Sequence, residues 1–448
     1  MARPPRSPRI HTSRWRSRWA LPLLAAAAGM GSVSGPAAAS GPGAPASSVF
    51  VVAGTGRPGS GTGPALRAAL DGPSAVAVGP GGAVVIADTG NCRVVEVPGA
   101  LVSPGPPAPG GKVRVVAGDG CAGPAGPAGA PATRAQIGAV QGVALDAAGD
   151  LFIADTPGDR VLEVPASTTT RLGVTMAAGH LYTVAGEGAP AAPDGAGPNG
   201  TPGLDGPQGL AVDPAGDLFI ADTGHCEVRE VPAHSGTQFG VPMVAGGLFT
   251  VAGSGRCGTI AGASVATGDG GPALQAVLWT PSAVALGPSG DLVIADRGND
   301  SVRVVAAAAG TFYGVPVAAD DIATVAGSGA GYGPYLVDGL SATGPTAGLN
   351  FVSGVAVDGQ GDLFIADLYD RAVREVAGSS GTSFGRSVTT GDLYTLVGAV
   401  PAGATGDGTR WVASRVTYPS GVAVAPDGEV VFADRGANLV RVVVPPGS

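Results

Sequence analysis

One pattern recurs six times along the sequence and constrains the fold more than any other feature. Each copy ends a run of apolar residues with an Ile/Phe-Ala-Asp step. The closing residues are Asp88, Asp155, Asp222, Asp296, Asp367 and Asp434. They are spaced by 67, 67, 74, 71 and 67 residues. A near-fixed period of this size is typical of a repeat architecture. The repeat therefore overrides the two or three domains that a length of 448 residues would otherwise suggest.

A single copy, residues 209–231, reads as three strands. Two apolar runs flank Pro214-Ala215-Gly216, and Pro followed by Gly is the chemistry of a tight hairpin turn. The second run, residues 218–221, is apolar on both alternating faces, so we expect it to be covered on both sides. The third run, residues 227–231, mixes charge with valine, so we expect it nearer to solvent. A fourth run of the type YTVAG or FTVAG follows after a longer connection.

Four antiparallel strands per copy, with the inner ones covered on both faces, predict an all-β, six-bladed β-propeller of four-stranded blades. A β-helix would have a shorter period, and a sandwich would expose half of each inner strand. A fourth-strand pattern occurs at Val51, before the first hairpin, whereas none follows residues 439–444. We therefore expect the N-terminal strand to join the last blade and close the ring, which removes the open edges. The predicted propeller spans residues 49–448.

The first 39 residues resemble an export signal. Six arginines and no acidic residue precede a short apolar core at residues 20–30, and three alanines follow at 37–39. A core of this length is too short to span a bilayer, which takes about 20 residues. We expect a signal peptide at 1–39, a disordered linker at 40–48 and a secreted protein without a membrane span after cleavage. An uncleaved anchor or a disordered cytosolic tail is the alternative.

Removal of such a leader makes the chain strongly acidic. The full sequence has 25 basic and 34 acidic residues, and the leader takes only arginines from this balance. The remaining net charge of about −15 disfavours nucleic acid and anionic membranes as partners.

Residues 208–231, 353–376 and the connection at 267–286 resemble the NHL-repeat family of propellers. The resemblance implies binding of proteins or other macromolecules through a propeller face, and related propellers are lyases or lactonases. The sequence departs from the family pattern where Glu227, Ser301 and Leu439 replace the arginines seen at Arg93 and Arg160. A ligand site built on a complete ring of those arginines is therefore not expected.

Four cysteines in an exported chain predict disulfides, and three pairings exist in principle. Cys92 and Cys226 follow the second strand, whereas Cys121 and Cys257 follow the fourth strand of the same two copies. These places adjoin in an antiparallel blade, which predicts Cys92–Cys121 and Cys226–Cys257. A four-cysteine metal site is the alternative.

The candidate functional residues lie where strands begin and end. The six aspartates above could gather a cation or a basic partner, but we expect each to cap its own turn, as Asx residues do. The residues that enter the first strands should ring the mouth of the central channel and are candidates for ligand binding. They are Ser74, Gln141, Gln208, Ser282, Ser353 and Ser420.

The sequence gives little evidence of a catalytic site. The inner strands read VAV, VAL or LAV, whereas a metal-dependent hydrolase needs carboxylates there. His225 belongs to one rim and His180 and His234 to the other, so they cannot converge. Phe239 and Phe384, in connections that share an S-G-T-x-F-G pattern, either pack their own loops or form an exposed patch.

We therefore expect a monomeric, secreted binding module for an extracellular protein or glycan, with no catalytic residue, metal or cofactor. The alternative is a metal-dependent propeller lyase or lactonase acting in the channel, and a third possibility is a structural component of a cell wall or matrix.

Overall fold

The computed structural model describes residues 47–101, 111–121, 129–171, 174–186, 203–258, 267–327, 338–345, 347–398 and 414–446. All of them belong to one compact unit, Gly43–Ser448. The leader expected at 1–39 and most of the linker expected at 40–48 lie outside the described residues. The described part of the chain holds no helix long and apolar enough to cross a membrane.

Six antiparallel sheets form the six blades predicted from the repeat. The first strands are β3 (Ala75–Val78), β8 (Val140–Leu145), β14 (Pro207–Val212), β21 (Pro281–Leu286), β28 (Val352–Val357) and β34 (Pro419–Val424). The second strands are β4 (Val84–Asp88), β9 (Leu151–Asp155), β15 (Leu218–Asp222), β22 (Leu292–Asp296), β29 (Leu363–Asp367) and β35 (Val430–Asp434). The third strands are β5 (Arg93–Val97), β10 (Arg160–Val164), β16 (Glu227–Val231), β23 (Ser301–Val305), β30 (Ala372–Val376) and β36 (Leu439–Val444).

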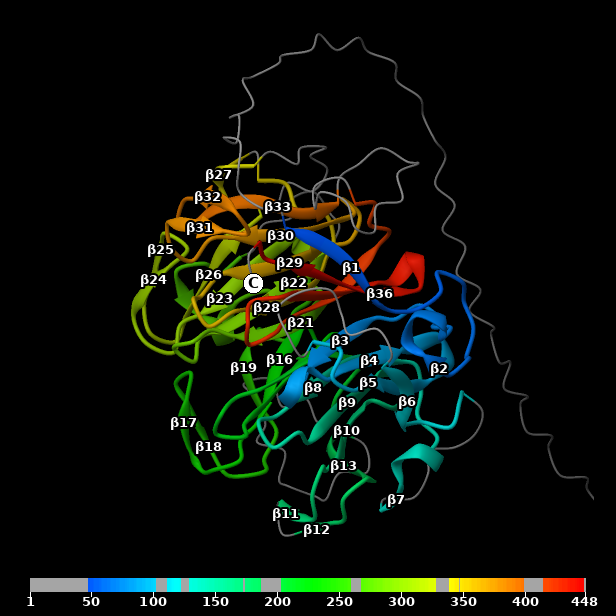
Figure 1. Ribbon diagram of the computed structural model, residues 1–448. Coiled ribbons are helices and arrows are strands. Elements are labelled where there is room, and N and C mark those ends of the chain that lie inside the picture. The colour runs from blue at the N-terminus through cyan, green and yellow to red at the C-terminus, as the bar shows by residue number, and fades with distance from the viewer. Residues whose placement is uncertain are drawn as a thin grey trace, which may run out of the picture. The chain divides into compact units, whose positions relative to one another are not determined.

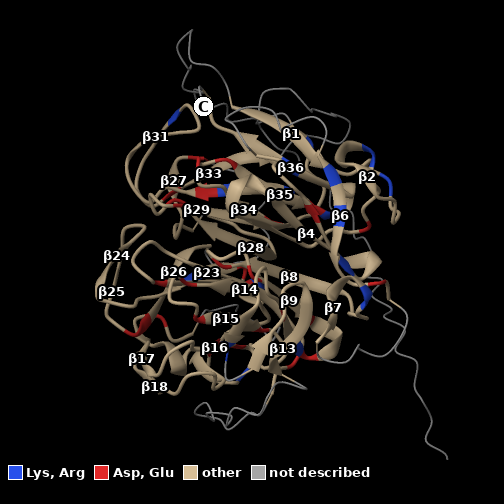
Figure 2. Ribbon diagram, turned by 60° about the horizontal axis from the view of Figure 1, so that its bottom comes forward, with Lys and Arg blue, Asp and Glu red and all other residues tan. Residues whose placement is uncertain are grey.

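The outer strands complete the blades. The fourth strands are β6 (Lys112–Ala117), β13 (His180–Gly186), β19 (Phe249–Ala252), β26 (Asp321–Ala326), β33 (Asp392–Gly398) and β1 (Ser48–Ala53). Four blades also gain a two-residue fifth strand that the sequence did not predict: β2 (Gly63–Pro64), β7 (Ala130–Pro131), β20 (Gly271–Pro272) and β27 (Leu340–Ser341). Figure 2 shows basic segments gathered around β2 and β6, at the outer edge of blade 1.

The ring closes as predicted. Each first strand contacts the first strands of both neighbouring blades, and β3 of blade 1 contacts β34 of blade 6. Strand β1 pairs antiparallel with β36, with Val49 opposite Val443, so the N-terminal strand is the outer strand of blade 6. Figure 1 shows blue β1 beside red β36.

The first strands approach one another so closely that side chains are restricted. A Cβ atom added at Gly142 would meet the Gln208 carbonyl oxygen, and one added at Gly209 would meet the Cα atom of Ala283. The inner ring is therefore built from glycine and alanine at this position because neighbouring backbones are in contact.

The second strands are buried along their whole length in all six blades, which confirms that they are covered on both faces. The expectation that the third strands lie nearer to solvent was wrong. All five residues of β16, β23 and β30 are buried, including Arg229, Arg303 and Arg374. Charge in these strands indicates buried ion pairs rather than exposure.

Two-stranded hairpins follow the third strands of blades 2 to 5: β11–β12 (Thr169–Arg171, Val174–Met176), β17–β18 (Gly236–Gln238, Val241–Met243), β24–β25 (Gly310–Phe312, Val315–Val317) and β31–β32 (Gly381–Ser383, Arg386–Val388). Phe239 and Phe384 are buried at two of their turns. Each packs edge-on against a second-strand phenylalanine, Phe219 at 6.1 Å and Phe364 at 6.0 Å between ring centroids. They pack their own hairpins and do not form an exposed patch.

Candidate functional site

The six repeated aspartates are buried and connect two parts of each blade. In every blade one carboxylate oxygen accepts a hydrogen bond, 2.7 to 2.9 Å long, from the backbone N–H of the residue seventeen positions earlier. The donors are Asp71, Gly138, Asp205, Trp279, Asn350 and Thr417. Each bond ties the segment that enters the first strand to the end of the second.

This contact differs from the turn cap predicted for the aspartates, which stays a prediction for Asp222 and Asp367. The turns after Asp88, Asp155, Asp296 and Asp434 receive no capping hydrogen bond from the aspartate side chain. An Asx cap takes a backbone donor from the next residues, whereas here the backbone donor comes from the preceding segment. The Asn91 and Asn299 side chains also donate to Asp88 and Asp296, both at 2.8 Å.

An arginine pairs with each aspartate. In blades 1 and 2 it is Arg93 or Arg160, five positions after the aspartate, at 2.7 and 2.8 Å. In the other four blades it comes seven positions after, at 3.3 to 3.9 Å between nitrogen and oxygen. These residues are Arg229, Arg303, Arg374 and Arg441.

The sequence departures at Glu227, Ser301 and Leu439 are thus compensated within the same strand. A shift of two residues keeps the side chain on the same face of a strand, and this spacing is the signal that the sequence interpretation missed. Burial raises the pKa of Asp296 to about 6, although Arg303 opposes the rise. Each aspartate thus pairs with an arginine of its own blade.

The serines predicted at the channel mouth hold neighbouring blades together. The Ser282 hydroxyl donates to the carbonyl of Val352 in the next blade at 2.9 Å. Ser353 donates likewise to Pro419, and Ser420 donates to Pro73, which links blade 6 to blade 1.

Blades 2 and 3 have glutamine in place of this serine, and a threonine one position after the aspartate takes over. Thr156 donates to the Pro207 carbonyl at 2.6 Å, and Thr223 donates to the Pro281 carbonyl at 2.7 Å. Blade 1 has both groups, because Ser74 and Thr89 each donate to the Val140 carbonyl. Every blade therefore donates a hydroxyl hydrogen bond to the next one around the ring.

The central cavity is small, about 80 Å³. Five of the six predicted mouth residues line it: Ser74, Gln141, Ser282, Ser353 and Ser420. The sixth, Gln208, accepts a hydrogen bond from Arg297 of blade 4 at 3.1 Å. The other described residues that line the cavity are glycine, alanine, valine and leucine. Ligand binding by the mouth residues stays a prediction.

Three aromatic side chains form an exposed cluster on the same rim, which we call the aromatic patch: Phe351, Tyr369 and Tyr418. Tyr369 is 51% exposed and Tyr418 is 38% exposed. The ring centroids of Phe351 and Tyr369 are 4.9 Å apart, and those of Tyr369 and Tyr418 are 6.3 Å apart. Arg297 lies over the Phe351 ring at 5.0 Å, and Arg371 lies over the Tyr418 ring at 5.4 Å.

Phe351 and Tyr418 stand at a repeat position where two of the other blades have glycine. Phe351 and Tyr418 have φ of 65° and 60°, in the left-handed region, where blades 1 and 3 have Gly72 and Gly206. Left-handed backbone costs a residue with a Cβ atom about 1 to 2 kcal/mol. Two aromatic side chains of the patch therefore stand on strained backbone, as Thr280 does at the same position of blade 4.

Tyr369 also stands where other blades have glycine. Its position, two residues after the aspartate, is glycine in four other blades, at Gly90, Gly224, Gly298 and Gly436. Replacement of a repeat glycine by an aromatic residue in blades 5 and 6 is the sequence signal for this patch, and the sequence interpretation overlooked it.

The histidines do not converge. His225 bonds through Nδ1 to the buried Asp222 carboxylate at 2.8 Å, beside the channel mouth. His180 begins β13, and His234 lies in the connection after β16, both at the opposite rim. Among the described residues, no group of three or more His, Cys, Asp or Glu side chains is placed to hold a metal ion.

Both predicted disulfides are present. Cys92 is bonded to Cys121, and Cys226 is bonded to Cys257, across sequence separations of 29 and 31 residues. The alternative of a four-cysteine metal site was wrong.

A family model described as NHL repeat matches residues 70–96 and 204–230. The chain is a six-bladed β-propeller in which two blades match the NHL repeat. The matched repeats extend in blades 1 and 3 from the segment before the first strand into the third strand. They are also the two blades that contain the disulfides. No curated protein matches the chain at a significant level of sequence similarity.

Solved structures share the propeller fold at low identity. The chain is similar to a Bacteroides thetaiotaomicron protein of unknown function, with 13% identity and a TM-score of 0.55 over 89% of this chain and 76% of that chain. It is also similar to an auxiliary nutrient binding protein from Bacteroides ovatus, with 13% identity and a TM-score of 0.53 over 90% of this chain and 78% of that chain. At these identities the similarity shows the fold alone.

Proposed function

We propose that this propeller is a secreted, monomeric binding module that holds an extracellular glycan on its channel-mouth rim. The observation that carries the proposal is the aromatic patch, in which Tyr369 and Tyr418 are exposed on a rim where Phe351 and Tyr418 adopt left-handed backbone. The leader expected at 1–39 and the two disulfides support export, because disulfides persist in oxidising compartments.

A glycan suits the patch better than the other expected partner class, a protein. Aromatic rings carry a negative face on which the slightly positive C–H face of a sugar ring packs. Hydrogen-bonding groups for sugar hydroxyls surround the rings: the Arg371 guanidinium is exposed, and Asp370 accepts a hydrogen bond from Asn350 at 3.4 Å. The Bacteroides ovatus nutrient binding protein has the same fold, so the fold is compatible with a binding role.

A polysaccharide retention assay tests the proposal. The purified chain from residue 40 is incubated with cellulose, chitin, xylan, pectin, starch and peptidoglycan, and the bound fraction is measured. We expect at least one polysaccharide to retain the wild-type protein and the Y369A/Y418A variant to lose that retention. The matched control is V244A, which removes an exposed apolar side chain of similar accessibility, 51%, in the connection after β18.

Two results would contradict the proposal. One is equal retention of wild type and Y369A/Y418A, with circular dichroism showing that both are folded. The other is the absence of retention by every polysaccharide, which would favour the protein class of partner.

A further inference from the structure

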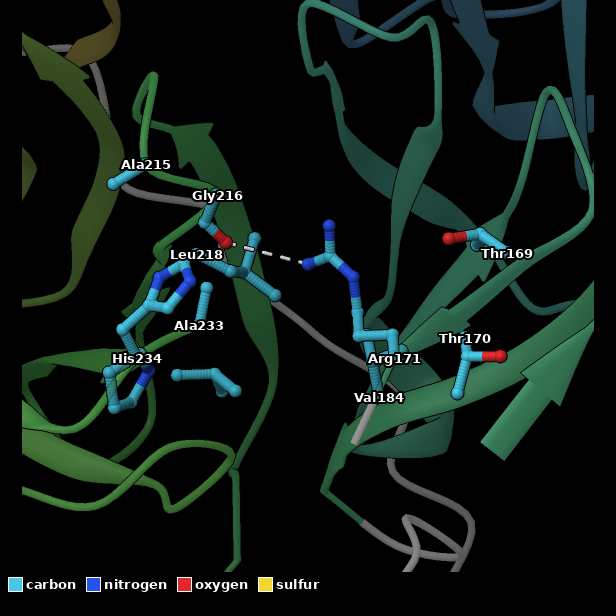
Figure 3. Close-up of a pocket in the computed structure, with 11 residues that line it drawn as sticks. Thr169, Thr170, Arg171, Val184, Ala215, Gly216, Leu218, Ala233 and His234 are labelled. Carbon is cyan, nitrogen blue, oxygen red and sulfur yellow. Dashed lines mark hydrogen bonds between the residues drawn. The ribbon is translucent and has the colours of Figure 1, made fainter. Parts of the chain in front are cut away.

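A second cavity opens between blades 2 and 3 at the rim opposite the channel mouth, and we call it the Arg171 cleft. Its volume is about 300 Å³, at the lower end of the range for small-molecule sites. The hairpin residues Thr169, Thr170 and Arg171 line one side, and the β14–β15 turn with the connection after β16, including Gly216 and His234, lines the other. Figure 3 shows the Arg171 guanidinium pointing into the space between the two blades.

Arg171 reaches several protein groups, all at long distances. Its Nη1 donates to the Gly216 carbonyl at 3.4 Å, its Nε lies 3.5 Å from a Glu163 carboxylate oxygen, and its Nη2 lies 3.7 Å from Asp146. Charge-assisted hydrogen bonds of arginine are normally 2.7 to 2.9 Å long. The guanidinium has five N–H donors, and contacts of this length leave it able to form shorter bonds to an incoming group.

Aliphatic side chains from both blades line the cleft near the arginine. They are Leu218 and Val231 of blade 3 and Val184 of blade 2. The Arg171 guanidinium also lies over the Phe152 ring at 5.1 Å, which fixes its plane. A cleft with one planar cation and an aliphatic wall matches a ligand that has an acidic head on an apolar body.

We propose that the Arg171 cleft binds a small monocarboxylic acid. Two N–H groups of Arg171 donate to its carboxylate, and its apolar body packs on Leu218, Val231 and Val184. A ligand with two negative charges fits poorly, because Asp146 and Glu163 already face Arg171 and Asp217 also interacts with it electrostatically. This site is independent of the aromatic patch, which lies on the other rim.

The buried Glu163 carboxylate competes with the ligand for Arg171. Burial raises the pKa of Glu163 to about 7, Arg171 opposes the rise, and Asp150 and Asp146 add to it. The exposed His234 faces the same cleft from blade 3. Glu163 is therefore mostly neutral at pH 6 and mostly charged at pH 8, with neutral fractions of about ten in eleven and one in eleven. Since only the neutral form releases Arg171, affinity should fall about ten-fold between these pH values.

Calorimetric titration of the purified propeller with hexanoate, benzoate and phenylacetate, at pH 6 and pH 8, tests the proposal. We expect at least one of the three acids to bind at pH 6, about ten-fold tighter than at pH 8, and the corresponding amide not to bind. E163Q should remove most of the loss at pH 8, because Arg171 then has no charged competitor on that side.

The double variant R171M/E163Q removes both charges, so that no unpaired carboxylate is left buried, and it should not bind the acid. R386M/E375Q, which removes the equivalent hairpin arginine and buried glutamate of blade 5, is the matched control and should bind normally. The proposal is overturned if none of the three acids binds at pH 6, if the amide binds as well as the acid, or if R171M/E163Q binds like wild type.

Discussion

Glu230 should make the propeller less stable as the pH rises. It lies in β16, its side chain has no exposure to solvent, and burial followed by the charges of Asp217 and Asp213 raises its pKa to about 8 from an ordinary value of 4.5. The native state therefore holds the proton more tightly than the unfolded chain does. The stabilisation from this proton is complete below about pH 4.5 and is lost as the pH rises through about 8.

The magnitude follows from the two pKa values. Each pKa unit corresponds to 1.36 kcal/mol, so full ionisation of Glu230 in the folded protein lowers the free energy of unfolding by about 5 kcal/mol. E230Q keeps the shape of the side chain and cannot ionise. We expect it to match wild type at pH 5 and to be about 3 to 5 kcal/mol more stable at pH 9.

Urea unfolding of the oxidised protein at pH 5 and pH 9 measures this difference. E96Q is the matched control, because Glu96 occupies the same position in blade 1 and pairs with Arg114 at 2.7 Å, so its removal should give no gain at pH 9. If wild type and E230Q lose the same stability between pH 5 and pH 9, Glu230 is not buried as a neutral acid and the reasoning fails.

Three other variants test the ring and its strain. T223V should lower the free energy of unfolding by about 1 to 2 kcal/mol, since the buried Pro281 carbonyl loses its donor. T89V should lower it less, because Ser74 also donates to the Val140 carbonyl. Equal losses of the two variants in urea titrations would refute the inter-blade role of these hydroxyls. C226S/C257S should lose about 3 kcal/mol, from opening a loop of about 30 residues, with no loss in reducing buffer relative to reduced wild type. T280G should raise the melting temperature, since Thr280 has φ of 48° at the position of Gly72, and glycine relieves strain of about 1 kcal/mol; a lower melting temperature would argue against strain at this position.

The fold could be predicted because its determinants are local and repeated. Turn residues such as Pro214 and Gly216, and the two-faced apolar run at Leu218–Asp222, recur in each copy, and the missing strand after β36 has its counterpart in β1. The disulfide pairs followed from the same register, because equivalent positions in two blades are equivalent in space.

The site was harder to predict because its contacts join residues that are far apart in the sequence. A carboxylate such as Asp88 does not reveal that its donor lies seventeen residues earlier, and Ser282 does not reveal that its acceptor belongs to the next blade. The Arg171 cleft requires the spatial placement of a hairpin from blade 2 against a turn of blade 3. Two features did have a sequence signal: the two-residue shift of the paired arginines, and the aromatic residues Phe351, Tyr369 and Tyr418 at positions where other blades have glycine.

Protection of tyrosines from nitration tests most directly that the channel-mouth rim is the binding face. The propeller is treated with tetranitromethane with and without a soluble fragment of the polysaccharide that retains it, and nitration of each tyrosine is measured by peptide mass spectrometry. Bound glycan should slow the nitration of Tyr369 and Tyr418, whereas the nitration rate of Tyr182 in β13 should be the same with and without glycan. Unchanged nitration of Tyr369 and Tyr418 at saturating glycan would contradict the assignment of the binding face.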